Sequence, residues 1–585
     1  MANLSKRGRV LMMSMMMIAL AVGLAYQYRL ELLIFGLPRV QAIAEPVSAN
    51  QPVVWQTTAN ALGDPKGMAH QQPLDQSVEA TRGEEPIAPE QNAQSPMPRP
   101  PNIIVILADD MGFNDVSFYN GGAADGSLQT PHIDAIAHNG IAFDNGYAGN
   151  AVCAPSRAMI MTGRYSTRFG YEYTPFFKIG LTIFDWMQQA QPGLIATQFN
   201  YEEADKMPGV TAGMPSSEIT IAEQLRERGY HTVHIGKWHL GATGDEVPNA
   251  QGFDESLTMK GGLYLPEDSP DVVNMKQPFD TIDNMVWATA KYAASYNDGE
   301  LFEPKGYLTD YYTDEAVKVI AANRERPFFL YLAHWGIHNP LQAKRSDYEA
   351  LAHIQDERLR VYAAMTLALD RGVGRVMQAL KDQGIYDNTL VVFTSDNGGA
   401  GYLGLPDINK PFRGWKLNLF EGGIHVPFMM QWPEALSPGM RYAPPVSHLD
   451  IFSTVLAAAG ATEPTDRPID GVNLIPHLNG TLATPPRDTL FWREGHHQAV
   501  LHQGWKLIVS KNRRWLFKLH DDPTEQNNLI VSEGSRAEEL TALLAEHNAE
   551  QVEPLWPSAM EGPQWIDKTG AEPKTLDDEY VIWPN

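Results

Sequence analysis

Four short hydrophobic runs stand out along the chain, and each of them is followed by polar residues. The first begins at Asn102, and the others span His231 to Ile235, Phe328 to Ala333 and Leu390 to Thr394. A continuous apolar run of this length is typical of a strand that is buried on both faces of a parallel sheet. We therefore expect these four runs to be central strands of one sheet.

Helical patterns lie between these runs. Thr220 and Glu223 form a capping box before a helix that we expect to end at Gly229. Thr313 is placed to cap the next helix, and residues 359–383 carry apolar side chains at three- and four-residue steps. Because strands alternate with helices, the sequence predicts an α/β fold with a large mixed, mainly parallel sheet flanked by helices.

The pattern changes past about residue 484. Short candidate strands, centred on Leu490, Ala499, Lys506 and Leu516, alternate there with turn residues, which predicts a small antiparallel sheet. A helix from Arg536 to His547 is expected to pack on it, and the Trp- and Pro-containing tail to Asn585 shows no clear period. We therefore divide the folded chain into a main domain over residues 101–483 and a C-terminal antiparallel-sheet subdomain with its tail over residues 484–585.

The amino terminus predicts export. Lys6, Arg7 and Arg9 precede an uncharged, apolar stretch from Val10 to Tyr28, which is typical of a signal peptide. The stretch is also long enough to remain as a membrane anchor, so residues 1–44 are interpreted as either a signal peptide or an N-terminal anchor. In both cases the rest of the chain is expected in the periplasm or outside the cell.

Residues 45–100 have the composition of a linker. They are rich in Pro, Gln, Ala and Glu and contain few aromatic or branched side chains. Such a segment buries too little apolar surface to offset the entropy that ordering removes. We therefore expect a disordered linker between the amino terminus and the main domain.

The charge balance restricts the partners of this protein. Lys and Arg total 45 and Asp and Glu total 70, so the net charge of −25 repels nucleic acid, which is not expected as a partner. An anionic substrate would have to be bound by local cations. The single cysteine, Cys153, excludes an intrachain disulfide and any cysteine-rich zinc site.

Polar side chains follow all four predicted strands: Asp109 and Asp110, then Lys237 and His239, then His338, then Asp396 and Asn397. Ligands of open α/β sheets bind beyond the carboxyl ends of the strands, so these groups are expected at one edge. Three carboxylates and one amide suit a hard divalent cation, and Ca²⁺ is preferred over Mg²⁺ because calcium accepts more ligands and looser geometry. The alternative is that the acidic pairs only form turns.

Cys153 lies at the predicted start of a helix. Pro155 suits the first turn, and the helix is expected to continue through Met161, which places the Cys153 side chain at the positive end of the helix, where anions bind. Two alternatives remain. The cysteine could be a buried small hydrophobe, or a thiolate nucleophile whose pKa is lowered by the helix end and Arg157.

Ordered motifs from Asn102 to about Leu529 resemble the sulfatase family. They are Cys153-x-Pro155-Ser156-Arg157 with Met161-Thr162-Gly163-Arg164-Tyr165, Gly236-Lys237-Trp238-His239-Leu240-Gly241, His338-Asn339-Pro340-Leu341-Gln342, Ser395-Asp396-Asn397-Gly398-Gly399, Lys416 with Glu421-Gly422-Gly423, and Asp522-Pro523-x-Glu525-x-Asn527-x-Leu529. The spacing around His338 and Lys416 is most similar to the arylsulfatases, including the N-acetylgalactosamine-4-sulfatase type. The resemblance implies an alkaline-phosphatase-like fold, with residues 101–483 as the catalytic domain, and hydrolysis of sulfate monoesters.

The resemblance also implies a role for each motif residue. In this family a separate formylglycine-generating maturation enzyme oxidises the signature cysteine, here Cys153, to formylglycine, whose hydrate attacks sulfur. The implied metal ligands are Asp109, Asp110, Asp396, Asn397 and residue 153, and the implied sulfate-binding cations are Arg157, Lys237 and Lys416. His338 would protonate the leaving oxygen, and His239 would take the proton when sulfate is eliminated.

The substrate stays open at this point. The stretches from Phe169 to Pro215 and from Leu263 to Glu303 depart from a typical relative, and we expect them to set specificity. Arg413, in the basic cluster before Lys416, is a candidate for substrate contact. An external sulfated glycan and an aryl sulfate are both compatible substrates. The alternatives are a phosphonate or phosphate ester hydrolase of the same superfamily and a non-catalytic glycan-binding relative.

Overall fold

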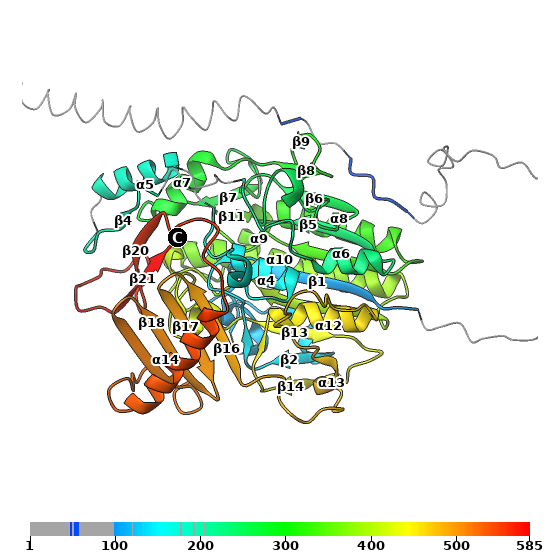
Figure 1. The fold of residues 1–585 in the computed structure, drawn as a ribbon. Coiled ribbons are helices and arrows are strands. Elements are labelled where there is room, and N and C mark those ends of the chain that lie inside the picture. The colour runs from blue at the N-terminus through cyan, green and yellow to red at the C-terminus, as the bar shows by residue number, and fades with distance from the viewer. Residues whose placement is uncertain are drawn as a thin grey trace, which may run out of the picture.

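The central element of the fold is a ten-stranded sheet. The computed structural model, drawn in Figure 1, describes residues 47–48, 52–57, 99–119, 121–175, 178–190, 193–203, 206, 209 and 211–585. From edge to edge the strands are β14 (Met440–Tyr442), β2 (Ile141–Phe143), β13 (Phe428–Gln431), β12 (Thr389–Ser395), β1 (Asn102–Ala108), β10 (Phe328–Ala333), β5 (His231–Gly236), β6 (Glu255–Met259), β8 (Ala294–Tyr296) and β9 (Leu301–Phe302).

The four predicted strands form the middle of this sheet and run parallel to one another. β1 lies between β10 and β12, so that Ile103 is paired with Phe329 on one side and Leu390 on the other. All residues of β1, β5, β10 and β12 are buried. Antiparallel pairs occur further out, between β12 and β13 and between β6 and β8. The prediction of a mixed, mainly parallel sheet is confirmed.

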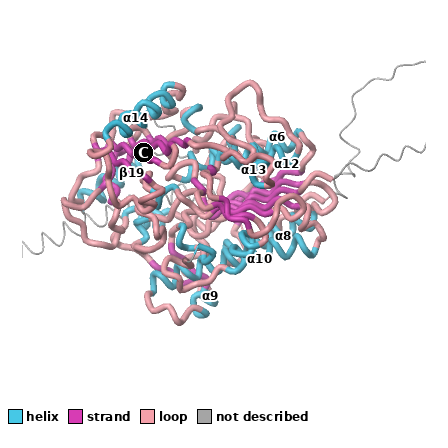
Figure 2. The backbone as a smooth tube through the Cα atoms, turned by 90° about the horizontal axis from the view of Figure 1, so that it is seen from below, coloured by secondary structure: helices cyan, strands magenta, loops and turns pink. Residues whose placement is uncertain are grey.

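Helices cover both faces of the sheet, because alternate side chains of each strand point to opposite sides. Ile104 and Ile106 pack with α3 (Pro131–His138), α8 (Leu308–Ala322) and α10 (Glu357–Asp382). Ile103 and Val105 pack with α4 (Cys153–Thr162), α6 (Ile221–Glu227) and α12 (Leu449–Ala459). Figure 2 shows α8 and α10 on one side of the strands and α6 and α12 on the other. The main domain is therefore a three-layer structure.

Local sequence signals place some helix ends and miss others. The Thr220 hydroxyl accepts a hydrogen bond from the Glu223 amide (3.1 Å), and the Glu223 carboxylate accepts one from the Thr220 amide (2.8 Å), as the capping box predicted. The prediction that Thr313 caps a helix is wrong, since α8 begins at Leu308 and the Thr313 hydroxyl donates to the Thr309 carbonyl (2.9 Å). The first turns of α8 are buried against the core, and this packing outweighs the local signal.

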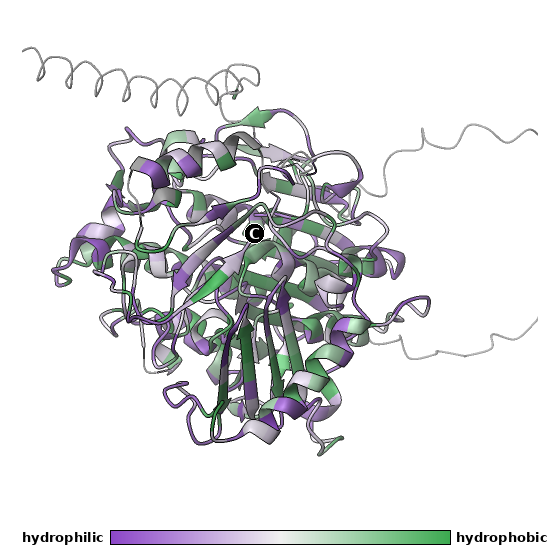
Figure 3. Cartoon of the chain, turned by 60° about the vertical axis from the view of Figure 1, so that its left-hand side comes forward, coloured by the Kyte–Doolittle hydropathy of each residue, from purple (hydrophilic) through white to green (hydrophobic). Residues whose placement is uncertain are grey.

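The C-terminal subdomain is built on a four-stranded antiparallel sheet, in agreement with the sequence. Its strands are β16 (Thr489–Glu494), β17 (His497–His502), β18 (Trp505–Ser510) and β19 (Arg513–Lys518). Helix α14 (Gly534–Ala549) packs on one face through Leu540 and Leu544, and the other face packs against the main domain around Tyr147 and Phe420. Figure 3 shows that hydrophobic residues follow the strands while hydrophilic residues gather on outer loops.

The tail after α14 folds back onto the main domain, which the sequence did not indicate. Strands β20 (Met560–Trp565) and β21 (Tyr580–Pro584) form a three-stranded sheet with β4 (Gln198–Phe199). Other elements of the fold include the helices α5 (Lys178–Ala190), α7 (Thr281–Thr289) and α11 (Glu421–Ile424). They also include the short strands β3 (Gly146–Tyr147), β7 (Val272–Met275), β11 (Leu341–Lys344) and β15 (Val446–Ser447). The exact domain boundaries stay predictions.

The prediction of an unbroken disordered linker over residues 45–100 is wrong at two short pieces. Trp55 is only 5% exposed, and its indole nitrogen donates to Glu315 (2.9 Å). The Ser48 amide donates to the Leu301 carbonyl (2.9 Å) at the edge of the ten-stranded sheet. A single large aromatic side chain is enough to fix such a piece, because its burial contributes strongly to packing.

The predicted signal peptide or anchor at residues 1–44 lies outside the described residues. None of the helices in the described part of the chain combines the length and the apolar character that a membrane crossing requires.

A buried ion pair cluster joins the two domains. Lys506 on β18 is completely buried, and its Nζ lies 2.7 Å from Glu421 Oε1 and 2.9 Å from Glu525 Oε1. Glu421 is the first residue of α11 in the main domain, and its amide donates to Glu525 Oε2. Burial raises the pKa of Glu525 to about 7, against the opposing effect of Lys506. One ammonium group therefore compensates two buried carboxyl groups.

We predict that Lys506→Met destabilises the protein by about 3–5 kcal/mol, because it leaves two buried carboxyl groups without a cation. Thermal and urea unfolding would measure the change. Lys518→Met is the matched control, because Lys518 on β19 is partly exposed and pairs with the exposed Asp521, and a surface pair of this kind contributes about 0–1 kcal/mol. Equal unfolding midpoints for the two variants would contradict the prediction.

Candidate active site

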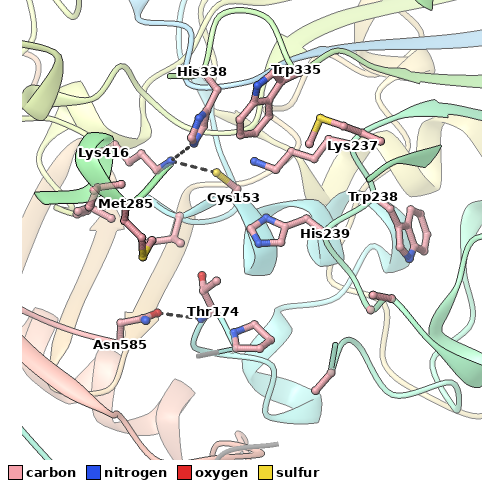
Figure 4. A pocket seen from close by; sticks show the side chains of 18 of the residues that line it. Cys153, Thr174, Lys237, Trp238, His239, Met285, Trp335, His338, Lys416 and Asn585 are labelled. Carbon is pink, nitrogen blue, oxygen red and sulfur yellow. Dashed lines mark hydrogen bonds between the residues drawn. The ribbon is translucent and has the colours of Figure 1, made fainter. Parts of the chain in front are cut away.

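The residues predicted from the four strand ends meet around Cys153. Lys416 Nζ lies 3.2 Å from Cys153 Sγ and 2.7 and 2.8 Å from the two carboxylate oxygens of Asp110. Figure 4 shows Cys153 between Lys416 and Lys237, with His338 on one side of it and His239 on the other. The carboxyl edge of the sheet is therefore the candidate site, as the positions of the motifs predicted.

Two consecutive carboxylates reach Cys153 because the chain turns at the end of β1. Cys153 Sγ lies 3.6 Å from one carboxylate oxygen of Asp109 and 3.6 Å from one of Asp110. Successive strand residues normally point to opposite faces, but Asp110 has a φ of 59°, in the left-handed region. This strained conformation breaks the alternation and brings both side chains to the same place, as is common at functional sites.

Each carboxylate of the site has its own cation. Arg157, which is completely buried, binds Asp396 Oδ2 through Nε (2.9 Å) and Nη2 (2.8 Å). Lys237 Nζ lies 2.8 Å from Asp109 Oδ2, and Lys416 binds Asp110. Three negative and three positive side chains therefore cancel within one buried cluster. A divalent cation and an anionic substrate can be added to this cluster without leaving a large unbalanced charge.

The buried cluster shifts the titration of its members. Burial and the neighbouring Asp396 raise the pKa of Asp109 to about 7. Burial acts in the same direction on Asp110, but Lys416 and His338 outweigh it and hold the pKa of Asp110 below its usual range. Burial and Asp396 raise the pKa of the Cys153 thiol above its usual range. The lowered pKa that the thiolate alternative required for Cys153 is therefore wrong.

His338 is held by groups on both sides of its ring. Its Nδ1 lies 2.6 Å from the Asn339 carbonyl, which can only accept, so Nδ1 carries a proton and Nε2 faces the site. Nε2 lies 3.5 Å from both Lys416 Nζ and Asp110 Oδ2. The ring stacks on Trp335 with 4.0 Å between centroids, and burial lowers the pKa of His338 to about 3. In the neutral ring, Nε2 is available as an acceptor or ligand.

His239 lines the same pocket from the loop after β5. It has a φ of 63°, another left-handed conformation, and its Nδ1 is a buried atom without a hydrogen-bond partner among the described residues. Burial, together with Lys237 and Arg157, lowers the pKa of His239 well below its usual range. The ring is therefore neutral and lines the pocket together with Cys153.

The cluster fits a metal ion. Asp109, Asp110, Cys153 and His338 each offer a ligand atom, and these atoms all lie within 4.8 Å of one another. Asn397 Nδ2 donates to Asp110 Oδ1 (2.7 Å), and Asn397 Oδ1 is buried and has no hydrogen-bond partner among the described residues. Carboxylate and amide oxygens are the ligands that a hard divalent cation prefers. If residue 153 is converted to formylglycine, the Cys153 sulfur stands where an oxygen ligand would lie.

The predicted ligand Asp396 is not part of this four-residue group. Its Oδ2 is bound by Arg157, and its Oδ1 accepts a hydrogen bond from the Asp110 amide (3.1 Å). The loop that carries Asp396 and Asn397 approaches the Lys416 loop closely, since a Cβ on Gly398 would lie 1.9 Å from the Gly422 carbonyl oxygen. The role of Asp396 as a metal ligand stays a prediction.

The sequence motifs did not identify two further residues of the site, Tyr402 and Trp335. The Tyr402 hydroxyl donates to Asp110 Oδ2 (3.1 Å), and Lys237 Nζ lies 4.8 Å from the centroid of the Trp335 indole. Tyr402 and Trp335 each come after a predicted strand, but an aromatic residue in such a position is equally typical of the hydrophobic core.

Arg413 was predicted as a candidate for substrate contact, but it binds Asp567 (2.6 Å) and Glu579 (2.5 Å) in the tail.

The site lies at the bottom of a pocket of about 500 Å³. Cys153, Lys237, His239, His338 and Lys416 all line it. The rest of the wall includes side chains from α5, α7 and the tail. The two stretches expected to set specificity thus contribute to the pocket, and the tail joins them.

Known proteins match most of the chain. The human N-acetylgalactosamine-6-sulfatase is 33% identical over 385 residues, which cover 65% of this chain and 66% of that enzyme. The mouse steryl-sulfatase is 32% identical over 485 residues, which cover 70% of this chain and 71% of that enzyme. The crystal structure of Ps i-CgsB in complex with k-i-k-neocarrahexaose is 30% identical, with a TM-score of 0.65, and covers 78% of this chain and 95% of that one.

Family models agree with these relatives. The sulfatase model matches residues 101–461, and the model of the N-sulphoglucosamine sulphohydrolase C-terminal region matches residues 414–553. The finer likeness to N-acetylgalactosamine-4-sulfatases stays a prediction. The matched ranges contain all the motif residues that meet around Cys153, and the chain belongs to the sulfatase family of sulfuric ester hydrolases.

Proposed function

We propose that this protein hydrolyses external sulfate monoesters, of a glycan or of an aryl alcohol, with formylglycine derived from Cys153 as nucleophile and Ca²⁺ as cofactor. The proposal rests on one observation: Cys153 contacts Asp109, Asp110 and Lys416 at one edge of the sheet. The location outside the cytoplasm is proposed from the basic and apolar pattern of residues 1–44, with membrane anchoring if that segment is retained.

The cations of the site would bind the sulfate group. A sulfate monoester is an anion that repels a nucleophile until its peripheral oxygens are neutralised. Arg157, Lys237 and Lys416 supply fixed positive charge next to residue 153, and in a buried site such charge acts strongly and needs no reorganisation. Local cations therefore offset the overall charge of −25.

An aldehyde at residue 153 and a divalent cation would supply the reactive chemistry. A hydrated aldehyde at residue 153 would supply the hydroxyl nucleophile and a second hydroxyl for release of sulfate by elimination, and a divalent cation would supply a Lewis acid. Asp109, Asp110, Asp396 and Asn397 are the residues we propose to hold the cation. The neutralised cluster around them keeps these side chains in place before substrate binds.

Two histidines would move protons on opposite sides of residue 153. His338 Nε2 faces the site beside Lys416; its neutral ring would first take up a proton, which the negative charge of the bound ester favours, and would then pass that proton to the leaving oxygen. His239 lines the pocket together with Cys153, and its ring would accept the proton when sulfate is eliminated. The stack on Trp335 and the bond to the Asn339 carbonyl fix the orientation of His338.

We predict that purified, matured protein hydrolyses 4-nitrophenyl sulfate with a higher kcat/KM than 4-nitrophenyl phosphate. Lys416→Ala is expected to lower kcat by about 10²–10³-fold, since it removes a fixed charge from the reacting group. Lys410→Ala is the matched control on the same loop, because Lys410 is exposed and pairs with Asp407. Preferred cleavage of the phosphate ester would favour the phosphate or phosphonate hydrolase alternative, and binding without turnover would favour the non-catalytic one.

We predict that oxidation of Cys153 precedes folding. The residue is 3% exposed and lies beneath Lys416 and the two aspartates, so a maturation enzyme cannot reach it in the folded chain. Mass spectrometry of the tryptic peptide that contains residue 153 should show the aldehyde after co-expression with a formylglycine-generating enzyme. The same enzyme added to folded, unmodified protein should leave the thiol intact. Efficient conversion of the folded protein would contradict this order.

We predict that Asn397→Ala weakens Ca²⁺ binding by about 10- to 100-fold, because the buried Asn397 Oδ1 loses its role as a ligand. Calorimetric titration of chelator-treated protein measures this without requiring activity. Asn388→Ala is the matched control, since Asn388 precedes the opposite end of β12 and donates to the Arg99 carbonyl. Unchanged Ca²⁺ affinity in Asn397→Ala, or tighter binding of Mg²⁺ than of Ca²⁺ by the unaltered site, would argue against the proposed cofactor.

A further inference from the structure

The tail follows α14, and from residue 554 on it lies outside both family models, which end at residues 461 and 553. It nevertheless forms a defined element, because β20 pairs with β21 on one side and with β4 on the other. β4 belongs to the stretch from Phe169 to Pro215 that departs from a typical relative. The tail therefore lies beside a segment expected to set specificity.

Several polar contacts hold this tail in place. The Asn585 amide donates to the Met560 carbonyl (2.9 Å), and the Asn585 side chain accepts from the Thr174 amide (3.0 Å), a contact drawn in Figure 4. Arg413 binds Asp567 and Glu579, and it precedes Lys416 by three residues. The tail is thus fixed to the loop that carries a proposed sulfate-binding lysine.

The tail also touches the immediate neighbours of the reacting groups. Trp583, which is 8% exposed, forms an apolar cluster with Val152 and Leu417, and Met560 packs against it. Val152 precedes Cys153, and Leu417 follows Lys416. Trp583 and Met560 both line the pocket above Cys153, so the tail forms part of the wall that faces the alcohol portion of an ester.

Most of the rest of this wall is apolar, although Thr174, Thr258 and Asn585 also line it. Ile282 and Met285 come from α7, and Phe184 comes from α5. No Asp or Glu side chain lines the pocket in the described part of the chain, and its charged side chains of fixed sign are Lys237, Lys260 and Lys416. A sugar brings many hydroxyl groups that lose water on entry and need new partners, whereas a flat apolar ring loses none. The wall therefore favours an apolar ring.

We propose that the tail is the specificity wall of the active site, with Trp583 and Met560 selecting sulfate esters of an apolar aromatic or alicyclic alcohol over sugar sulfates. This inference rests on the proposed function and narrows its substrate class. Trp583 and Met560 contact the alcohol portion, while the ion cluster at the bottom of the pocket holds the sulfate. Specificity and chemistry then come from different parts of the chain.

The test compares 2-naphthyl sulfate with galactose 6-sulfate. The matured protein is expected to prefer 2-naphthyl sulfate, and Trp583→Ala is expected to lower kcat/KM for this ester by about 10- to 100-fold, mainly through KM. The value for galactose 6-sulfate should change by less than about threefold, because the sulfate-binding cations are untouched. Trp583→Phe should retain most of the preference for 2-naphthyl sulfate. Met560→Ser should lower kcat/KM for 2-naphthyl sulfate in the same way but by a smaller factor.

Trp565→Ala is the matched control for the integrity of the tail. Trp565 lies on β20 and packs on Tyr580 with 5.4 Å between ring centroids, but it does not line the pocket. The kcat/KM values of the Trp565→Ala protein for both esters should stay close to those of the unaltered protein. An equal fall for both esters in Trp583→Ala and Met560→Ser, or a preference of the unaltered protein for galactose 6-sulfate, would overturn the inference.

A binding measurement separates this inference from the proposed function. Calorimetry on the Cys153→Ala protein follows 2-naphthyl sulfate without any turnover. Trp583→Ala in that background is expected to weaken binding at least about tenfold. If matured protein cleaves neither ester while this difference in binding persists, the proposed function is wrong, but the proposed role of the apolar wall in binding is supported. If Trp583→Ala leaves the binding of 2-naphthyl sulfate unchanged, the proposed role of the apolar wall is wrong even where both esters are cleaved.

Discussion

The burial of three carboxylates together with three cations is the constraint on which the rest of the site depends. A charged side chain that is removed from water and left unpaired is strongly destabilising, so Asp109, Asp110 and Asp396 can be buried only because Lys237, Lys416 and Arg157 accompany them. These six side chains come from distant parts of the chain. The central strands must therefore be fixed relative to one another before the cluster can form, and the buried apolar runs achieve this.

The same constraint explains how a strongly acidic protein can hold an anionic ester. The overall field at a charge of −25 disfavours any anion at long range. Within the pocket, the three cations are close to the reacting residue, and water does not screen them there as it does at the surface. A divalent ion and a sulfate ester then add charges of opposite sign to a neutral cluster. Binding is decided within a few ångströms of residue 153.

The sequence predicted those parts of the fold for which a local pattern of residues favours one structure. The four apolar runs are typical of buried strands, and the polar groups after them were expected at one edge because such strands run parallel. Thr313 and Trp55 show the limit of this reasoning. Core contacts decide where α8 begins, and a partner more than 200 residues away fixes Trp55. No local pattern in the sequence reports such partners.

The tail shows why specificity was harder to derive than chemistry. The reacting groups are tied to strand ends, where backbone geometry alone brings them together, so their positions could be predicted from spacing. Trp583 and Met560 reach the pocket because β20 and β21 pair with each other and with β4, segments without a shared periodicity in the sequence. An irregular tail of this kind can be altered without disturbing the buried ion cluster, since its contacts with Val152 and Leu417 are apolar and lie one residue away from the reacting groups. The chain thus separates the part that must stay fixed for catalysis from the part that can adapt to the alcohol.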